Sequence, residues 1–197
     1  MMSMNTLSGD ARSGLRPETE PASVLILPSW QGSGPEHGQT LWAQRDGYTV
    51  VEQNDWQRPR RGDWLARLDE VIVDAPGSVV LLGHGLGCIL VAAWASFSRH
   101  TARVRGALLV APADVEAPEL HEHLPGWAPI VRQTLPFPSV LVGCQNDPHC
   151  RTDRAHEMAQ NWGARWVLGE PFEHLKVDTS WGAWPQGHAL LQTLLKE

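Results

Sequence analysis

The residues with the clearest chemical pattern lie between Val79 and Cys88, where the chain reads VVLLGHGLGC. An apolar run ends in a glycine turn, and a helical pattern follows. This is the setting of the nucleophile elbow G-x-S-x-G, in which a serine sits on a sharp strand-to-helix turn. The motif here is GHGLG over residues 83–87, so Gly85 stands where the serine belongs. The turn is therefore predicted, but its attacking hydroxyl is missing.

A glycine-rich turn after a strand can also bind phosphate, through the backbone N–H groups at the start of the next helix. Two features weigh against this alternative. The turn follows the third apolar run rather than the first, and Cys88 stands where the fingerprint G-x-G-x-x-G has its last glycine. The turn after the first run, LPSWQGSG, lacks the Gly-Lys-Ser/Thr of a Walker A loop. A nucleotide-binding domain is the least favoured alternative.

An acid and a histidine follow two later apolar runs. Asp147 comes after the fifth run, in VGCQNDPHC, and His174 comes after the sixth, in GEPFEHLKVDTSWGAWPQG. Nucleophile position, acid and histidine, in that order, is the chain order of α/β-hydrolases. We expect Asp147 to hydrogen-bond one ring nitrogen of His174, while the other faces an empty space beside Gly85. Taken alone, Asp147 also fits an Asx turn before Pro148, and His174 fits an ordinary surface histidine.

Backbone donors for an oxyanion do not depend on the serine. The first is expected at the N–H of Leu86, directly after the nucleophile position. The second is expected in the loop after the first apolar run, from Trp30 or, as the next choice, from Ser29. With donors, acid and base in place, a Gly85→Ser substitution is expected to restore turnover.

Other side chains are not expected to replace the serine. Cys88 falls in a helix that is apolar nearly all round, where a buried neutral thiol behaves as a small hydrophobic group. Ser29, Ser33 and Ser180 lie near the predicted site but lack the presentation that the elbow gives. Glycine at residue 85 fits the turn itself, because a non-glycine residue with positive φ is strained by about 1–3 kcal/mol.

Six short apolar runs, rich in Val, Leu and Ile, indicate strands that are buried on both faces of a parallel sheet. They cover Ser23–Leu27, Tyr48–Glu52, Ser78–Leu82, Val104–Val110, Ser139–Val142 and Arg165–Leu168. Helical patterns lie between and after them, over residues 62–75 with Asp63 as the N-cap, 86–98, 152–163 with Gly163 at the end, and 187–197. This alternation predicts an α/β fold with helices on both faces of the sheet.

One connection is long and contains six prolines, between Ala111 and Pro138. Because it follows a strand's carboxyl end, we expect it to form a lid or pocket wall, with a surface excursion of no role as the alternative. Trp30, Trp127 and Trp181 are candidates for an apolar pocket, and core packing is an equal alternative for each.

Composition limits the function classes. The chain has 197 residues, a net charge of −6 and a sequence pI of about 5.8, which argues against a nucleic-acid partner. We expect a flexible arm over residues 1–22 and a single domain over 23–197, with no signal peptide or membrane span. Three cysteines without a C-x-x-C pair favour a cytoplasmic location.

The chain resembles the retinoblastoma-binding protein 9-like serine hydrolases, a small subfamily of α/β-hydrolases, from about Ser23 to its C-terminus. The motifs that carry the resemblance are LPSWQGSGPEHGQTLW, EQNDWQRPRRGDWLARLDEVI, GHGLGC, APAD, NDP and HLKVDTSWGAWPQG. The resemblance implies a three-layer α/β-hydrolase fold, with about six mostly parallel strands flanked by helices. It also implies a triad formed by residue 85, Asp147 and His174. The chain departs from the family at Gly85 and at Glu173, where the family has glycine.

Two functional hypotheses follow. The first is a hydrolase of small esters, thioesters or amides, acting through an acyl-enzyme with no metal or cofactor, and inactive or crippled as written because of Gly85. The second is a non-catalytic pseudoenzyme that binds a small acyl ligand or a protein partner through the same pocket. Neither hypothesis calls for nucleic acid or a membrane as partner, and the sequence makes no prediction of oligomeric state.

Overall fold

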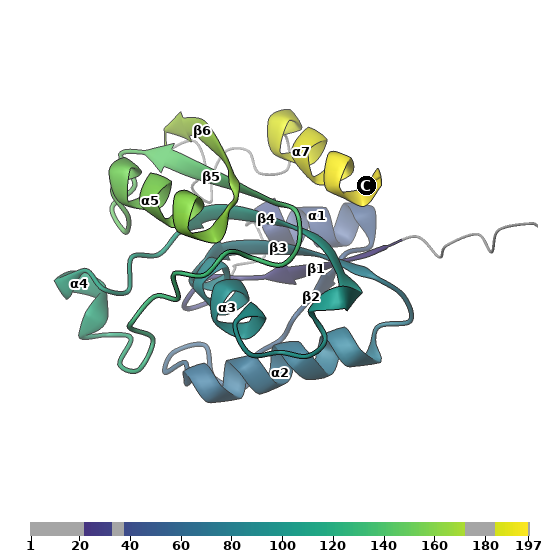
Figure 1. Ribbon diagram of the computed structural model, residues 1–197, viewed down its shortest axis with the longest axis horizontal. Helices are drawn as coiled ribbons and strands as arrows, with labels where there is room; N and C mark the ends of the chain where they lie inside the picture. The colour runs from purple at the N-terminus through teal and green to yellow at the C-terminus, as the bar shows by residue number, and fades with distance from the viewer. Residues whose placement is uncertain (1–21, 33–37, 172–183, 197) are drawn as a thin grey trace, which may run out of the picture.

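The computed structural model describes residues 22–32, 38–171 and 184–196 (Figure 1). Its centre is a sheet of six parallel strands in the order β2-β1-β3-β4-β5-β6. The strands are β1 (Ser23–Leu27), β2 (Thr49–Val50), β3 (Val79–Gly85), β4 (Val104–Pro112), β5 (Ser139–Gln145) and β6 (Arg165–Pro171). Each of the six apolar runs thus contains or begins a strand, which confirms the predicted fold class. Most of the expected N-terminal arm, residues 1–21, lies outside the described residues.

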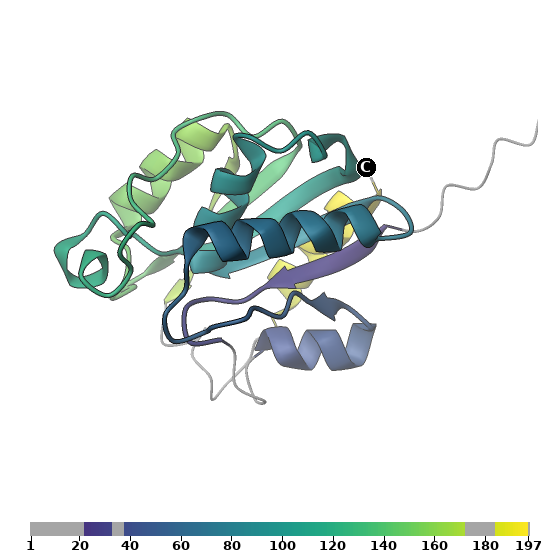
Figure 2. The ribbon, with the colours of Figure 1, turned by 90° about the horizontal axis from the view of Figure 1, so that it is seen from below.

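Helices cover both faces of the sheet and complete three layers (Figures 1 and 2). One face is covered by α2 (Arg61–Asp74), α3 (Leu86–Ala95) and α5 (Thr152–Trp162), and the other by α1 (Gly38–Asp46) and α7 (Pro185–Lys196). A 3₁₀ turn, η1 (Thr101–Arg103), and a short helix, α4 (Pro118–His121), lie in connections. Leu25 and Leu27 pack toward α2 and α3, whereas Val24 and Ile26 pack toward α1 and α7, because side chains alternate along a strand.

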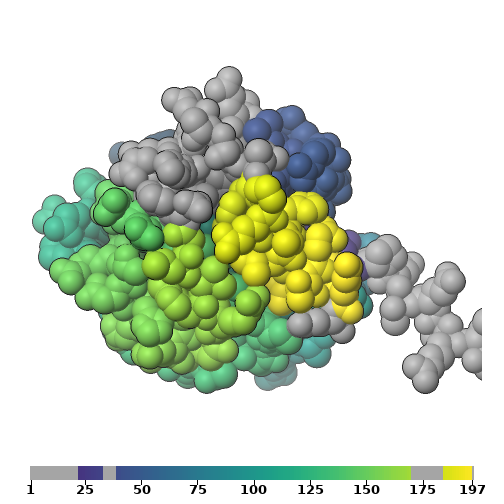
Figure 3. Space-filling view, turned by 90° about the horizontal axis from the view of Figure 1, so that it is seen from above, coloured from purple at the N-terminus to yellow at the C-terminus, as the bar shows by residue number. Residues whose placement is uncertain are grey.

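The pairing of α1 with α7 depends on tryptophan. Trp42 of α1 stacks on Trp184, with ring centroids 6.2 Å apart, and meets His188 of α7 edge-on at 5.5 Å. His188 Nε2 also lies 3.6 Å from a carboxylate oxygen of Asp46. Figure 3 shows α7 and α1 side by side on this face of the molecule. The C-terminal helix is thereby fixed over the sheet.

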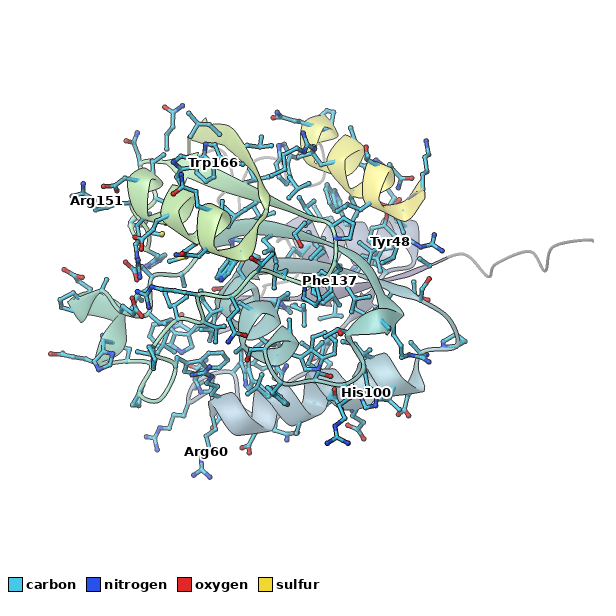
Figure 4. The ribbon with its side chains drawn as sticks, in the orientation of Figure 1. Tyr48, Arg60, His100, Phe137, Arg151 and Trp166 are labelled. Carbon is cyan, nitrogen blue, oxygen red and sulfur yellow. The ribbon has the colours of Figure 1, made fainter. Side chains whose placement is uncertain are left out.

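The far edge of the sheet is packed in the same way. Trp166 of β6 lies beside α5 (Figure 4), and its ring centroid is 5.1 Å from that of His156. A Cβ on Gly143 of the neighbouring β5 would overlap the Trp166 ring, so this close approach requires glycine. Gly163 ends α5 in the left-handed region at φ 63°, as predicted.

The predicted N-cap of α2 is wrong. Arg60, with extended backbone, is the N-cap residue, and no side chain caps the helix there. Asp63 instead lies in the first turn, where its negative charge is favourable beside the positive end of the helix dipole. The helix begins at Arg61, two residues before the predicted cap.

Candidate active site

The site lies where the chain order reverses in the sheet. From β1 the chain passes to β2 on one side and then to β3 on the other, which leaves a crevice at the carboxyl ends of β1 and β3. Leu27 of β1 pairs with Gly83 of β3. Two residues beyond this pair are Ser29, in the loop that follows β1, and Gly85, the last residue of β3.

The turn at residue 85 has the geometry of a nucleophile elbow. β3 ends at Gly85 and α3 begins at Leu86, with no residue between them. Gly85 has φ 55° and ψ −116°, a conformation that glycine adopts readily and that strains other residues. Ala113 N–H donates a hydrogen bond to the Gly85 carbonyl at 3.2 Å, which ties the elbow to the end of β4.

The loop that follows β1, called the β1 loop, places Ser29 directly beside Gly85, next to the cavity that Gly85 also lines. The expectation that a ring nitrogen of His174 faces an empty space beside Gly85 stays a prediction, because His174 lies outside the described residues. A Cβ built on Gly85 would overlap the Ser29 hydroxyl and would come 2.7 Å from the Ser29 Cβ. Leu86 N–H donates a hydrogen bond to Ser29 Oγ at 3.3 Å. A serine hydroxyl from the β1 loop therefore lies where the side chain of the elbow residue would be.

These residues open on a cavity of about 230 Å³. Its polar side chains are Ser29, His84, Asp147 and His149, which come from three different strand ends. The rest of the wall is mostly apolar and is formed by Trp30, Ala111, Ala113, Leu120 and Leu124, with Gln31 and Gly85 completing it. Concave, mostly apolar cavities with a few convergent polar groups are the usual form of small-molecule sites.

Backbone strain gathers around this cavity. Among the described residues, the non-glycine residues with positive φ are Gln31 at 70°, Ala111 at 46° and Asn146 at 57°. Gln31 and Ala111 line the cavity, and Asn146 immediately precedes Asp147. Residues in such conformations cluster at functional sites, because the surrounding structure must hold them there.

Asp147 forms the Asx turn that the sequence allowed and also lines the cavity, while its role as the triad acid stays a prediction. Its Oδ1 accepts a hydrogen bond from His149 N–H at 2.8 Å, which is an Asx turn, and the carboxyl group also lines the cavity. Burial raises the pKa of Asp147 above its usual range, because the low-dielectric surroundings disfavour the charged form. His174, its expected partner, lies outside the described residues, so the Asp147–His174 hydrogen bond stays a prediction.

Two of the three predicted oxyanion residues, Ser29 and Trp30, line the cavity, and Leu86 directly follows Gly85, which also lines it. Leu86 offers its N–H to Ser29 Oγ, and Trp30 and Ser29 line the wall. The Trp30 ring stacks on His123 with centroids 5.5 Å apart, and its Nε1–H donates to the Gln57 carbonyl at 3.2 Å. The indole is thus a fixed part of the wall, while the oxyanion role of the Trp30 N–H stays a prediction.

The other two candidate pocket tryptophans differ from Trp30. Trp127 is fully buried, and its Nε1–H donates to the Pro59 carbonyl at 2.9 Å, so it belongs to the core. Trp181 lies outside the described residues. Three lining residues were not predicted from the sequence: Leu120, Leu124 and His149. His149 stands only two residues after Asp147, which is the one signal that could have indicated it.

The long connection forms a pocket wall, as expected, through Leu120 and Leu124. A charged cluster attaches it to α5. Arg154 contacts Asp114 at 3.3 Å and also pairs with Glu116, while Glu116 accepts from Arg132 at 2.7 Å and from the N–H of Ile130 at 2.8 Å. Arg154 therefore binds the start of the connection to α5, and Glu116 in turn binds Ile130 and Arg132 further along it, which attaches the wall to the helix.

The cysteines do not supply a thiolate. Cys88 is fully buried, its Sγ lies 3.4 Å from the Val110 carbonyl oxygen, and burial raises the pKa of its thiol. Burial also raises the pKa of Cys150, and that of Cys144 to about 12. This confirms Cys88 as a packing residue. Ser33 and Ser180 lie outside the described residues.

Metal ligands do not gather within ranges 22–32, 38–171 and 184–196, where no three His, Cys, Asp or Glu side chains could hold an ion together. Within the same ranges, no helix is long and apolar enough to cross a membrane.

Comparison with known proteins decides the family. The family model described as Serine hydrolase matches residues 24–193, which include the β1 loop, the elbow and Asp147. The chain belongs to the serine hydrolase family. None of the curated proteins compared with it matches.

Solved structures show the same fold. A protein from Pectobacterium atrosepticum described as a YdeN-like hydrolase has a TM-score of 0.74 at 22% identity, over 90% of each chain. The ydeN gene product of B. subtilis has a TM-score of 0.70 at 15% identity, over 89% of this chain and all of that one. The type II thioesterase BorB from the borrelidin cluster has a TM-score of 0.54 at 17% identity, over 92% of this chain and 93% of its own. This serine hydrolase family member thus shares its fold with proteins described as hydrolases and a thioesterase.

Proposed function

We propose that this chain is a member of the retinoblastoma-binding protein 9-like group that takes a small ester, thioester or amide into the cavity. The observation that carries the proposal is the elbow at Gly85, which lines a small, mostly apolar cavity together with Asp147 and is followed by the Leu86 N–H. The apolar wall suits a short acyl chain, and the N–H suits its carbonyl oxygen. Two proteins of similar structure, the thioesterase BorB and an esterase domain from Rhodothermus marinus, are described as enzymes that act on thioesters and esters, which supports the same class of ligand here.

The reaction in this proposal is acyl transfer. A hydroxyl attacks the carbonyl carbon, and backbone N–H groups stabilise the negative oxygen of the tetrahedral intermediate. His174 takes the proton of the attacking hydroxyl and then passes it to the leaving group, while Asp147 orients the imidazole. Water then hydrolyses the acyl-enzyme by the same steps in reverse order.

Gly85 offers no hydroxyl, so turnover through residue 85 is absent in the chain as written. In a well-studied serine protease, loss of the serine alone lowers kcat by roughly 10⁶-fold, about as much as loss of the whole triad. The second candidate function is therefore non-catalytic binding of the same ligand class. The observation that favours it is a glycine at the elbow, beside a small and mostly apolar cavity.

We propose the same ligand class and location that the sequence predicted, namely a small acyl compound and the cytoplasm. The ligand is a small acyl compound rather than nucleic acid or membrane, since the chain is acidic. We place the protein in the cytoplasm, because Cys88, Cys144 and Cys150 are free thiols, as a reducing compartment keeps them.

A neutral carbonyl compound tests the pocket without any chemistry. Titration with 2-hexanone, followed by ¹H–¹⁵N NMR, is expected to shift the amide signals of Leu86 and Leu124. Ala113→Leu fills the cavity and should abolish these shifts, whereas Ala66→Leu, an exposed site on α2, should leave them unchanged. Unchanged Leu86 and Leu124 signals at saturating ketone in the folded wild type would remove the basis for the proposed function.

A further inference from the structure

We propose that the Ser29 hydroxyl is the attacking oxygen of this chain, supplied by the β1 loop in place of the missing elbow serine. This inference rests on the proposed function and adds a catalytic residue to it. The first support is position. β1 and β3 pair as far as Leu27 and Gly83, and just beyond that pair the Ser29 hydroxyl fills the volume of a side chain at residue 85.

Glycine at residue 85 then has two effects: it relaxes the strained turn, and it leaves room for the Ser29 side chain. A side chain at that position would overlap the Ser29 hydroxyl and come 2.7 Å from the Ser29 Cβ. The volume accepts a side chain from residue 29 or from residue 85, but not from both. The elbow lacks a serine, and the loop beside it provides one at the same place.

The surroundings suit an oxygen that becomes negative. Leu86 N–H donates to Ser29 Oγ at 3.3 Å, and Leu86 is the first residue of α3, a helix of ten residues. A hydrogen-bond donor and the positive end of a helix dipole both stabilise an alkoxide as it forms. A nucleophile elbow likewise places its serine directly before the N-terminus of a helix.

The hydroxyl is both held and accessible. The Ser29 carbonyl accepts a hydrogen bond from Gly32 N–H at 3.0 Å, and Gln31 N–H donates to the Trp56 carbonyl at 3.1 Å, so the loop is anchored at two points. Ser29 is half-buried and lines the cavity together with Asp147. A fixed hydroxyl beside the space for the acyl group meets the positional demand on a nucleophile.

The proposed reaction consumes only the acyl substrate and one water molecule. Ser29 Oγ forms a bond to the acyl carbon, its proton passes to the histidine that is the general base of the proposed function, and the leaving group departs with that proton. A water oxygen then bonds to the acyl carbon, the Ser29 ester bond breaks, and Ser29 Oγ regains a proton as the carboxylic acid leaves.

Fluorophosphonate labelling of the intact chain, with the modified residue identified by peptide mass spectrometry, tests the proposal. We expect one label, on Ser29. Ser29→Ala should lower the labelling rate by at least about 10³-fold, in keeping with the large effect of losing a nucleophile. Ser96→Ala is the control, because Ser96 is an exposed serine at the opposite end of α3, and it should label at the wild-type rate.

Ser29→Cys gives a second readout if Ser29→Ala does not fold. A thiol at residue 29 beside the Leu86 N–H should react with iodoacetamide in the native protein, whereas the three natural cysteines are buried and stay unmodified. Native Ser29→Cys protein that is no more reactive than wild type would overturn the inference.

The possible results distinguish a failure of Ser29 as nucleophile from a failure of the proposed hydrolase function. A label on another residue, or an equal rate in folded Ser29→Ala, overturns Ser29 as nucleophile and leaves the hydrolase proposal standing. No label on a wild type that binds 2-hexanone overturns Ser29 and favours the non-catalytic function. No label and no ketone binding overturns both.

Discussion

Two residues, Ser29 and Gly85, share one side-chain volume, and this changes what a serine at residue 85 can do. The sequence predicts that Gly85→Ser restores turnover with a stability loss from strain alone. The structure adds an overlap with Ser29, whose Cβ cannot move without the backbone. A serine at residue 85 therefore requires that the serine at residue 29 be removed. The double variant Ser29→Gly, Gly85→Ser, called the transposed variant, does both.

The transposition predicts a non-additive effect on stability. Gly85→Ser alone should lower the free energy of unfolding by more than the roughly 1–3 kcal/mol of positive-φ strain. In a Ser29→Gly background the overlap is removed, so the same substitution should cost less, with a coupling of at least about 1 kcal/mol. Urea unfolding of the wild type, both single variants and the double variant measures this coupling. If the changes in unfolding free energy of the two single variants simply add up in the double variant, the two side chains do not compete for the same volume.

Asp147 gives a pH-dependent prediction at the residue scale. Burial raises its pKa in the folded chain above the ordinary 3.8, so the native state retains a proton that the unfolded state releases. Above the unfolded pKa, this difference lowers the free energy of unfolding as pH rises. Asp147→Asn removes the effect and keeps an acceptor for His149 N–H.

We therefore expect Asp147→Asn to be more stable than the wild type at pH 7 and to match it near pH 3, as measured by urea unfolding at both values. A variant that is less stable than the wild type at pH 7, with no difference at pH 3, would contradict the direction of the pKa shift.

At the scale of elements, the close approach of α3 to β1 positions the elbow. A Cβ on Gly87, in the first turn of α3, would overlap the Leu27 carbonyl group of β1. Gly87→Ala should therefore lower the free energy of unfolding by roughly 1–3 kcal/mol, as overpacking does. Thermal unfolding measures the change.

Gly62→Ala is the control for this prediction. Gly62 lies in α2 with nothing within 4 Å of the added Cβ, so alanine should raise stability by about 0.4–1 kcal/mol. A Gly87→Ala protein as stable as Gly62→Ala would mean that α3 and β1 do not need the close contact.

The elements were predictable because each buried parallel strand is a continuous apolar run bounded by turn residues. The boundaries were less so. β3 runs on to Gly85 and β5 to Gln145, beyond their apolar runs, because partner strands continue to pair there. Asp63 looked like an N-cap by residue type, but Arg60 takes that position through backbone geometry.

The site was predictable only in part. The order of elbow, acid and histidine is visible in the chain, whereas the meeting of Ser29 with Leu86 joins residues 57 positions apart. That meeting depends on β1 lying next to β3 and on the register of the pair, which no local pattern specifies.

At the scale of the whole molecule, the cavity wall depends on the charged cluster of Asp114, Glu116, Arg132 and Arg154. This cluster holds the long connection between β4 and β5 to α5. Burial opposes ionisation of Glu116, but hydrogen bonds from Arg132 and from the Ile130 N–H, with the charges of Arg132 and Arg154, outweigh it and lower the pKa of Glu116. A lowered folded pKa contributes stability above the unfolded value of about 4.5, and this stability is lost as pH falls through the folded pKa.

Glu116→Gln should accordingly lower the free energy of unfolding by about 1–2 kcal/mol at pH 7 and by little near pH 3. Because Leu120 and Leu124 lie on the same connection, the variant should also bind 2-hexanone more weakly at pH 7. Urea unfolding and NMR titration measure the two effects. Equal losses of stability at both pH values would show that the ion pairs contribute nothing specific to the wall.

In this serine hydrolase site, the attacking hydroxyl can come from residue 29 or from residue 85, because the two side chains would occupy the same volume. This claim is tested most directly by the hydrolysis of p-nitrophenyl butyrate by the transposed variant, Ser29→Gly with Gly85→Ser. We predict turnover that falls by about 10²–10⁴-fold when His174→Ala is added, the usual contribution of a general base. A transposed variant that is folded and binds 2-hexanone, yet hydrolyses the ester no faster than its His174→Ala derivative, would contradict the account.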